Sequence, residues 1–129
     1  MPKDAYRIFN TWMGDPVRLL QLEAVLKCVN QYGLLANSAS TGERLRAGLF
    51  DIAARHPGRI SSVRGAGTIT AFDAPSGAKR DAIVAALRSA GVDIPVCGDA
   101  TVRCRPGLFF THKHADQFLE RLDTVVASM

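Results

Sequence analysis

The chain has few cysteines and no long apolar run, and each shortage excludes a class of protein. Its three cysteines, Cys28, Cys97 and Cys104, show no Cys-x-x-Cys spacing, which argues against a disulfide framework and a zinc site. The longest uninterrupted apolar run, Ala82 to Leu87, is far below the roughly 18 residues needed to span a bilayer. The first residues have neither a secretory signal nor a transit peptide. We therefore expect a protein of a reducing compartment, with no metal site and no membrane partner.

The chain also lacks a tract of one charge sign. Its sixteen basic residues are scattered among twelve acidic ones, and the net charge is +4 at pH 7. Nucleic-acid-binding proteins concentrate their basic residues, so we expect no nucleic-acid partner. With 129 residues, 47% of them hydrophobic, the chain is long enough for one core and too short for two domains of ordinary size. One globular domain is expected.

Two helices are predicted in the first half of the chain. Asp15-Pro16 is typical of a helix start, because Asp caps free amide groups and proline is tolerated at the first helical position. Apolar residues then recur at helical spacing up to Gly33, at Leu19, Leu22, Leu26 and Val29. A second helix follows, and His56-Pro57-Gly58 ends it. Its expected inner stripe is Leu45, Leu49, Ile52 and Ala53.

The second half mixes strands and helices. Thr68 to Asp73 alternates as a half-buried strand does, and Ala78 to Ala90 has a helical apolar face. Val92 to Ile94 and Thr101 to Arg105 are expected to be extended, and a last helix begins near Thr111 as its cap. The order helix, helix, strand, helix, strand, strand, helix predicts an α+β fold, with a small, mainly antiparallel sheet covered by helices.

Two groups of residues that suggest chemistry have structural explanations. His56, His112 and His114 flank helix ends and are interpreted as surface histidines. Arg64 to Thr68, Arg-Gly-Ala-Gly-Thr, looks like a phosphate loop, but it precedes a strand and opens no helix. Its glycines are therefore expected to permit a bulge or a close backbone approach.

The segment from Thr101 to Pro106 is the main candidate for a binding function. Strand alternation places Val102 and Cys104 on one face and Arg103 and Arg105 on the other. One interpretation is a solvated face, with both guanidinium groups in water. The other is a carboxylate clamp, because the planar guanidinium fork suits a carboxylate better than any other side chain.

Several motifs resemble one enzyme family. Arg7 to Pro16, Arg-Ile-Phe-Asn-Thr-Trp-Met-Gly-Asp-Pro, closely resembles the segment that follows the catalytic lysine in the 4-aminobutyrate (GABA) aminotransferase branch of the class III, pyridoxal-phosphate-dependent aminotransferases. Later motifs resemble the family's segments in the same order and cover nearly the whole chain: Arg55-His56-Pro57, Arg64-Gly65-x-Gly67-Thr68, Phe72-Asp73, Cys97-Gly98-Asp99, Val102-Arg103-Cys104-Arg105-Pro106 and His114-Ala115-Asp116-x-Phe118.

The resemblance implies a fold-type I aminotransferase that moves an amino group from 4-aminobutyrate, or a similar ω-amino acid, to 2-oxoglutarate. Residues 1–15 would be an interface segment from the large domain, and residues 16–129 the C-terminal small domain. Pyridoxal 5'-phosphate would be bound mainly by the large domain upstream, and the enzyme would be a homodimer acting on small amino and oxo acids. Two alternatives remain, a lysine 6-aminotransferase or other ω-amino acid aminotransferase, and a free-standing, non-catalytic interaction module.

The resemblance also implies roles for single residues. Thr11 would contact the cofactor phosphate across the dimer interface, Arg103 would lie by the substrate carboxylates, and Arg105 would be structural. No residue here is expected to be catalytic, because the family's catalytic lysine lies upstream and none of the four lysines matches its context. The expected location is the mitochondrial matrix in a eukaryote and the cytoplasm otherwise. The chain departs from the family at Ala66, where an arginine is common, and at Pro95-Val96, where two glycines are common. The second departure is expected to change the backbone before Cys97.

Overall fold

The structure is a computed structural model that describes residues 3–129, and the chain divides into two compact units. The first unit ends at Gly33 and the second runs from Leu34 to Met129. In the described part of the first unit there is one helix, α1 (Pro16–Gln31), whose cap is Asp15 as predicted. The Asp15 carboxylate accepts a hydrogen bond of 2.9 Å from the backbone N–H of Val17. The predicted helix start is confirmed.

The apolar residues of α1 are not confined to the one predicted face, because Val17, Leu20 and Val25 lie on other sides of the helix. No residue of α1 is buried in the part of the chain that the structure describes. Leu19, Leu22 and Leu26 each keep more than half of their surface exposed. Exposed leucines of this kind are typical of a surface that packs against a partner.

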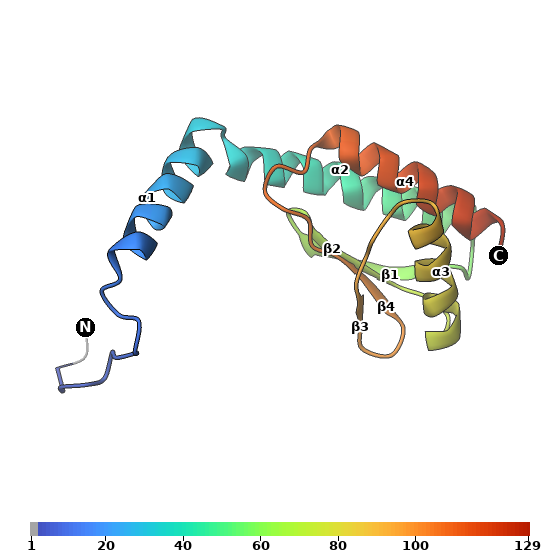
Figure 1. Ribbon diagram of the computed structural model, residues 1–129. Coiled ribbons are helices and arrows are strands. Elements are labelled where there is room, and N and C mark those ends of the chain that lie inside the picture. Colours follow the sequence, from blue (N-terminus) through green and yellow to red (C-terminus); the bar gives the residue numbers. More distant parts are fainter. Residues whose placement is uncertain (1–2) are drawn as a thin grey trace. The chain divides into compact units, whose positions relative to one another are not determined.

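The second unit contains three helices and four strands (Figure 1). The elements are α2 (Leu34–Arg55), β1 (Ser61–Ala66), β2 (Ile69–Asp73), α3 (Gly77–Ser89), β3 (Val96–Cys97), β4 (Thr101–Cys104) and α4 (His112–Ala127). The strands form one antiparallel sheet in the order β1-β2-β4-β3. The predicted α+β class with a small antiparallel sheet is confirmed.

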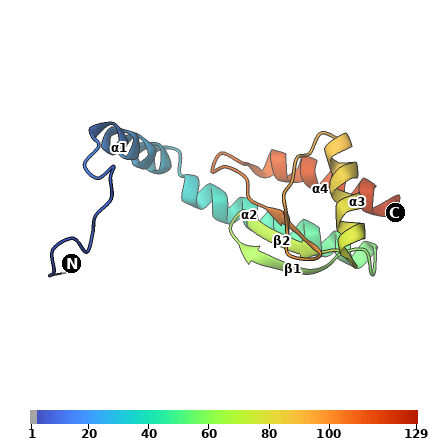
Figure 2. The same cartoon turned by 60° about the horizontal axis from the view of Figure 1, so that its bottom comes forward.

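Helices α2 and α4 lie side by side along the sheet, as Figure 1 and Figure 2 both show, and α3 packs against α4 and β4. Their inner faces and the inner face of the sheet form one core. Phe72 of β2 and Val102 of β4 are fully buried, as is Leu122 of α4. The inner stripe predicted for α2 is confirmed at Leu45, Leu49 and Ile52, which are buried, with Ala53 half-buried against the same core.

Two details of the sheet differ from the prediction. Strand β1 was not predicted, because its sequence, Ser-Ser-Val-Arg-Gly-Ala, shows no apolar alternation. In the structure one of its residues is half-buried and the others are exposed. The short edge strand β3 lies at Val96–Cys97 rather than at Val92 to Ile94. Ile94 is buried in the core, so its apolar side chain reflects packing of a loop and not pairing in the sheet.

The glycines of the hairpin between β1 and β2 allow a close backbone approach, as predicted. Gly65 has φ +132°, and a Cβ built on it would lie 2.2 Å from the carbonyl oxygen of Ile69. A Cβ on Gly42 of α2 would lie 2.0 Å from the carbonyl oxygen of Gly67. No larger residue fits either position without a backbone shift. The glycines therefore let α2 lie directly on the hairpin.

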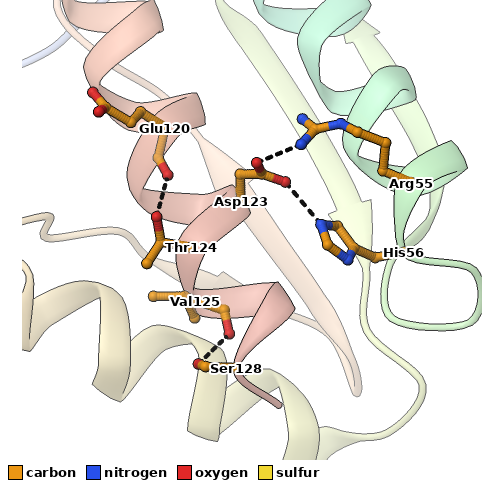
Figure 3. Close-up of polar contacts among 7 residues, drawn as sticks. All are labelled: Arg55, His56, Glu120, Asp123, Thr124, Val125 and Ser128. Carbon is orange, nitrogen blue, oxygen red and sulfur yellow. Dashed lines mark hydrogen bonds and ion pairs between the residues drawn. The ribbon is translucent and has the colours of Figure 1, made fainter.

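A polar brace connects the end of α2 to α4 (Figure 3). The Asp123 carboxylate pairs with Arg55 and lies 2.8 Å from His56 Nε2. The Arg55 hydrogen bond, and then that of His56, lowers the pKa of the Asp123 carboxyl. His112 and His114 are exposed as predicted, but the surface interpretation of His56 is wrong, because its side chain is mostly covered and bound to Asp123.

Candidate functional site

One face of the sheet is left without a helix from the second unit, and it carries the polar strand residues. Phe72 and Val102 point into the core, so their neighbours along each strand point the other way. Those neighbours are half-buried or exposed. We call the group formed by Arg64, Ala71, Asp73, Thr101 and Arg103 the outer-face cluster.

The strand register aligns this cluster across three strands. Arg64 of β1 lies opposite Ala71 of β2, and Ala71 lies opposite Arg103 of β4. Asp73 of β2 lies opposite Thr101 of β4. Directly opposite residues share a face, so both arginines and the one acidic residue of the four strands lie on the same surface.

Arg64, Asp73 and Thr101 form a hydrogen-bonded network. Arg64 Nη2 donates to Asp73 Oδ1 over 2.9 Å and to Thr101 Oγ1 over 3.1 Å. The Thr101 hydroxyl also donates to Asp73 Oδ1, at 2.5 Å. The Arg64 hydrogen bond is the main cause that lowers the pKa of the Asp73 carboxyl, followed by that of Thr101. Asp73 is therefore held as a carboxylate, and its charge is matched by Arg64.

Arg103 is the unmatched cation of the cluster. Its side chain is half-buried, and its Nε is shielded from solvent yet donates no hydrogen bond in the described chain. Among residues 3–129, none of the ion pairs includes Arg103. A buried donor without an acceptor costs about 1–3 kcal/mol, so it calls for a ligand or a further part of the protein.

Arg105, predicted to share the face of Arg103, lies one residue beyond the end of β4 and is not part of this cluster. Strand β4 ends at Cys104, so alternation no longer applies to the next residue. Arg105 is exposed and, with Cys104, lines a recess of about 270 Å³ bordered by α4 and residues 91–95. Of the residues the structure describes, Arg103 is not among those lining the recess.

Thr11 lies in an exposed turn of the first unit. The turn is held by Asn10, whose Oδ1 accepts from the backbone N–H of Trp12 at 2.9 Å and whose carbonyl accepts from that of Met13 at 3.2 Å. The Thr11 hydroxyl makes no hydrogen bond within residues 3–129. Asn10, and not Thr11, supplies the side-chain acceptor of this turn.

The residues present fit only part of a pyridoxal phosphate site. A hydroxyl such as Thr11 suits a phosphate oxygen, and an unmatched arginine suits a carboxylate. All four lysines are exposed: Lys3, Lys27, Lys79 and Lys113. None of these lysines lines the recess. The covalent attachment of the cofactor therefore has no candidate in the described part of the chain.

Within residues 3–129, no group of three or more His, Cys, Asp or Glu side chains is arranged to hold a metal ion. Over the same residues, no helix combines the length and apolar character that crossing a membrane requires.

The Arg64–Asp73–Thr101 network was missed by sequence reasoning. Its members lie on three different strands, and β1 was not recognised as a strand. The available signal was the conjunction of the Arg-Gly-x-Gly-Thr and Phe-Asp motifs, which a hairpin brings opposite each other. That signal becomes usable only once the hairpin register is known.

The family of the chain follows from comparison with known proteins. The class III aminotransferase family model matches residues 2–126. The 4-aminobutyrate aminotransferase of Dictyostelium discoideum is 46% identical over 128 residues, which are 99% of this chain and 26% of that protein. The mitochondrial 4-aminobutyrate aminotransferase of Sus scrofa is 42% identical over 98% of this chain and 25% of its own length. The chain thus spans about a quarter of the curated relatives it matches.

Solved structures agree with this assignment. The lysine aminotransferase of M. tuberculosis superposes with a TM-score of 0.88 at 27% identity, over 96% of this chain and 28% of that one. A phospholyase from Arthrobacter, solved with phosphoethanolamine, has a TM-score of 0.89 at 33% identity, over 95% of this chain and 31% of its own. With motifs, fold and similarity all agreeing over nearly its whole length, the chain belongs to the class III aminotransferases.

Proposed function

We propose that this chain is the C-terminal small domain of an enzyme that transfers the amino group of 4-aminobutyrate, or of a similar ω-amino acid, to 2-oxoglutarate. The observation that supports the proposal best is Arg103, a half-buried cation with a shielded Nε and no carboxylate partner in the described chain. We assign Arg103 the role of holding a substrate carboxylate.

The chemistry of the reaction explains why an unmatched arginine belongs here. Both substrates, an ω-amino acid and a 2-oxo diacid, carry carboxylates, so the site needs a cation that stays charged at every working pH. A guanidinium meets this need, and its Nε and Nη groups can donate to two carboxylate oxygens at once. A bound carboxylate would also give the shielded Nε of Arg103 the acceptor that it lacks.

Pyridoxal phosphate, when bound, supplies the electron sink that amino-group transfer requires. The part of the site that this chain contributes is a set of polar contacts. Thr11 is placed, in this proposal, on the cofactor phosphate of the partner subunit in a homodimer. Its hydroxyl is free within the described residues and exposed, as such a contact requires. The lysine and the remaining cofactor contacts come from the large domain, so the 129-residue chain alone is expected to be inactive.

The test is a pair of matched substitutions in the complete enzyme. Arg103→Lys keeps the charge but loses the planar fork, and is expected to lower kcat/KM for 2-oxoglutarate by roughly ten- to a hundredfold. Arg105→Lys, which lies outside the outer-face cluster, is the control and is expected to leave kcat/KM within about threefold. Normal kinetics for the Arg103 variant, or equal losses for both, would remove Arg103 from the site and restore the solvated-face interpretation.

The amino donor separates the leading proposal from its nearest alternative. The relatives named 4-aminobutyrate aminotransferase are 46% and 42% identical, whereas the lysine aminotransferase structure is 27% identical. This difference favours 4-aminobutyrate over lysine as the donor. Measuring kcat/KM for the two donors side by side decides between them. The cellular compartment stays a prediction, since the pig relative is named mitochondrial and the Dictyostelium relative is not.

A further inference from the structure

The one acidic residue of the sheet lies within reach of Arg103. Asp73 is opposite Thr101 and Ala71 is opposite Arg103, so Asp73 and Arg103 are diagonal neighbours on the outer face. Such neighbours have Cα atoms roughly 7–8 Å apart, a gap that an arginine side chain can bridge. An ion pair between Asp73 and Arg103 would cancel the charge that the proposed function requires.

The structure contains no such ion pair, and Asp73 is instead bound from the other side, by Arg64. Arg64 lies across Ala71, whose methyl side chain leaves room for it, and its Nη2 contacts both Asp73 Oδ1 and Thr101 Oγ1. The Thr101 hydroxyl donates to the same Asp73 oxygen. Arg64 and Thr101 thus donate to the same oxygen, Asp73 Oδ1, and hold the carboxylate beside Thr101 at the start of β4.

We propose that Arg64 is a positioning residue that holds Asp73 away from Arg103 and so keeps Arg103 available for the carboxylate of an amino or oxo acid. This inference rests on the proposed function of Arg103 and assigns a role to a residue outside the carboxylate contact. It also explains why two arginines and a single carboxylate share the outer face. Within residues 3–129, one arginine neutralises the carboxylate and the other has no acidic partner.

The competing explanation is that Arg64 and Asp73 form an ordinary cross-strand ion pair that stabilises the hairpin. The two explanations predict different patterns of substitution. A stabilising pair loses its effect when either partner is removed, and removing both gives no recovery. In the positioning role, loss of Arg64 releases Asp73 onto Arg103 and weakens carboxylate binding, whereas loss of Asp73 leaves Arg103 unmatched.

The first experiment compares four variants of the complete enzyme. Arg64→Gln is expected to raise KM for 2-oxoglutarate about fivefold with kcat little changed, the upper end of what a partly exposed ion pair contributes. Arg64→Lys, which still pairs with Asp73, should stay near the parent value. Asp73→Asn should bind as well or better, and the double variant Arg64→Gln with Asp73→Asn should recover the KM that Arg64→Gln loses. A double variant as weak as Arg64→Gln overturns the proposal.

A second experiment measures the pairing itself, without substrate, in the 129-residue chain. NMR titration gives the Asp73 carboxyl pKa in Arg64→Gln and in Arg64→Gln combined with Arg103→Gln, after circular dichroism has shown that both fold. If Asp73 turns to Arg103 when Arg64 is lost, the pKa of Asp73 rises when Arg103 is also replaced. An Asp73 pKa that ignores Arg103 overturns the inference. If the pKa responds but Arg103→Lys leaves the enzyme's kinetics normal, the proposed function fails while the pairing stands.

Discussion

Helices α1 and α4 have the same length, 16 residues, and both present apolar residues at helical spacing, yet they differ completely in burial. Helix α4 buries Ala115, Phe118, Leu122, Val125 and Val126. Helix α1 buries no residue in the described chain. Periodicity therefore predicts that a helix forms and which face is apolar, whereas burial depends on a partner surface that the periodicity does not specify.

The length of the relatives suggests a reason for the difference in burial between α1 and α4. About three quarters of each curated relative lies outside the segment matched here. Under the proposed function, that remainder contains the large domain and the surface that covers Leu19, Leu22 and Leu26. The segment around Phe9 and Trp12, also more than half exposed, would be covered in the same way. The first unit then serves the complete enzyme, and the second carries its own core.

The largest expected effect is the difference between a leucine substitution in α4 and one in α1 in the free energy of unfolding. Leu122→Ala in α4 removes a fully buried side chain and should lower the free energy of unfolding by about 2–5 kcal/mol. Leu22→Ala in α1 makes the same chemical change at an exposed site and should change it by about 0.5 kcal/mol or less. Urea unfolding of the 129-residue chain, followed by circular dichroism, measures both. Similar losses would show that the leucine face of α1 is buried in the chain itself.

The next effect tests the first unit by function instead of stability. Thr11→Ala in the complete enzyme should weaken retention of pyridoxal phosphate by roughly tenfold or more, because a hydrogen bond to a charged acceptor contributes about 1.5–3 kcal/mol. Thr11→Ser keeps the hydroxyl and is the control. The melting temperature of the cofactor-free protein should not change in either variant. Equal cofactor affinity in Thr11→Ala and the parent would show that the hydroxyl points elsewhere.

A smaller effect concerns the polar brace, the contacts of Arg55 and His56 at the end of α2 with Asp123 of α4. Arg55 and His56 lower the pKa of the Asp123 carboxyl, so its stabilising contribution is present above the unfolded carboxyl pKa and is lost as pH falls through the folded value. Asp123→Asn should cost on the order of 1 kcal/mol at neutral pH and flatten the acid limb of the stability curve. Glu43→Gln, whose carboxylate forms no ion pair in the described chain, is the control. An unchanged acid limb in Asp123→Asn would show that the brace adds nothing.

The smallest effect involves no change in stability. It is a difference in how fast the three cysteine thiols are alkylated. Burial raises the pKa of the Cys104 thiol to about 11, so this thiol should resist alkylation in the folded chain. Cys97 is exposed and Cys28 of α1 is half-buried, so both should react first. Mass spectrometry of iodoacetamide-treated chain, with and without urea, counts the labelled thiols. Rapid labelling of Cys104 without urea would mean that the core opens readily.

The regular elements of the second unit could largely be predicted from sequence, because their apolar residues repeat with a period. Leu45, Leu49 and Ile52 indicated α2, and Val102 and Cys104 indicated the inner face of β4. Strand β1 could not be predicted, since Ser61 and Ser62 carry no alternation and Ser62 has φ +52° beside an irregularity in the pairing with β2. A bulged edge strand has no period to detect.

The candidate site was predicted in part for a related reason. Arg103 stands out in a single strand, so its outward direction could be inferred from its neighbours. The partner of Asp73 could not, because Arg64 meets it only through the pairing of β1 with β2. For Arg105 the alternation was extended one residue beyond the end of β4, where it no longer fixes the direction of the side chain. Local pattern gives direction within an element, and register gives contacts between elements.

The two edges of the sheet also affect the tendency of this chain to aggregate at high concentration. An edge strand with a long row of free N–H and C=O groups recruits further strands and promotes aggregation. Here one edge, β1, is interrupted by its irregular pairing near Ser62, and the other, β3, has only two residues and directly follows Pro95, which has no N–H to offer. Pro95 is also one of the departures from the family's motif. At the edge of a sheet with an uncovered face, the same residue discourages two copies of the chain from joining strand to strand.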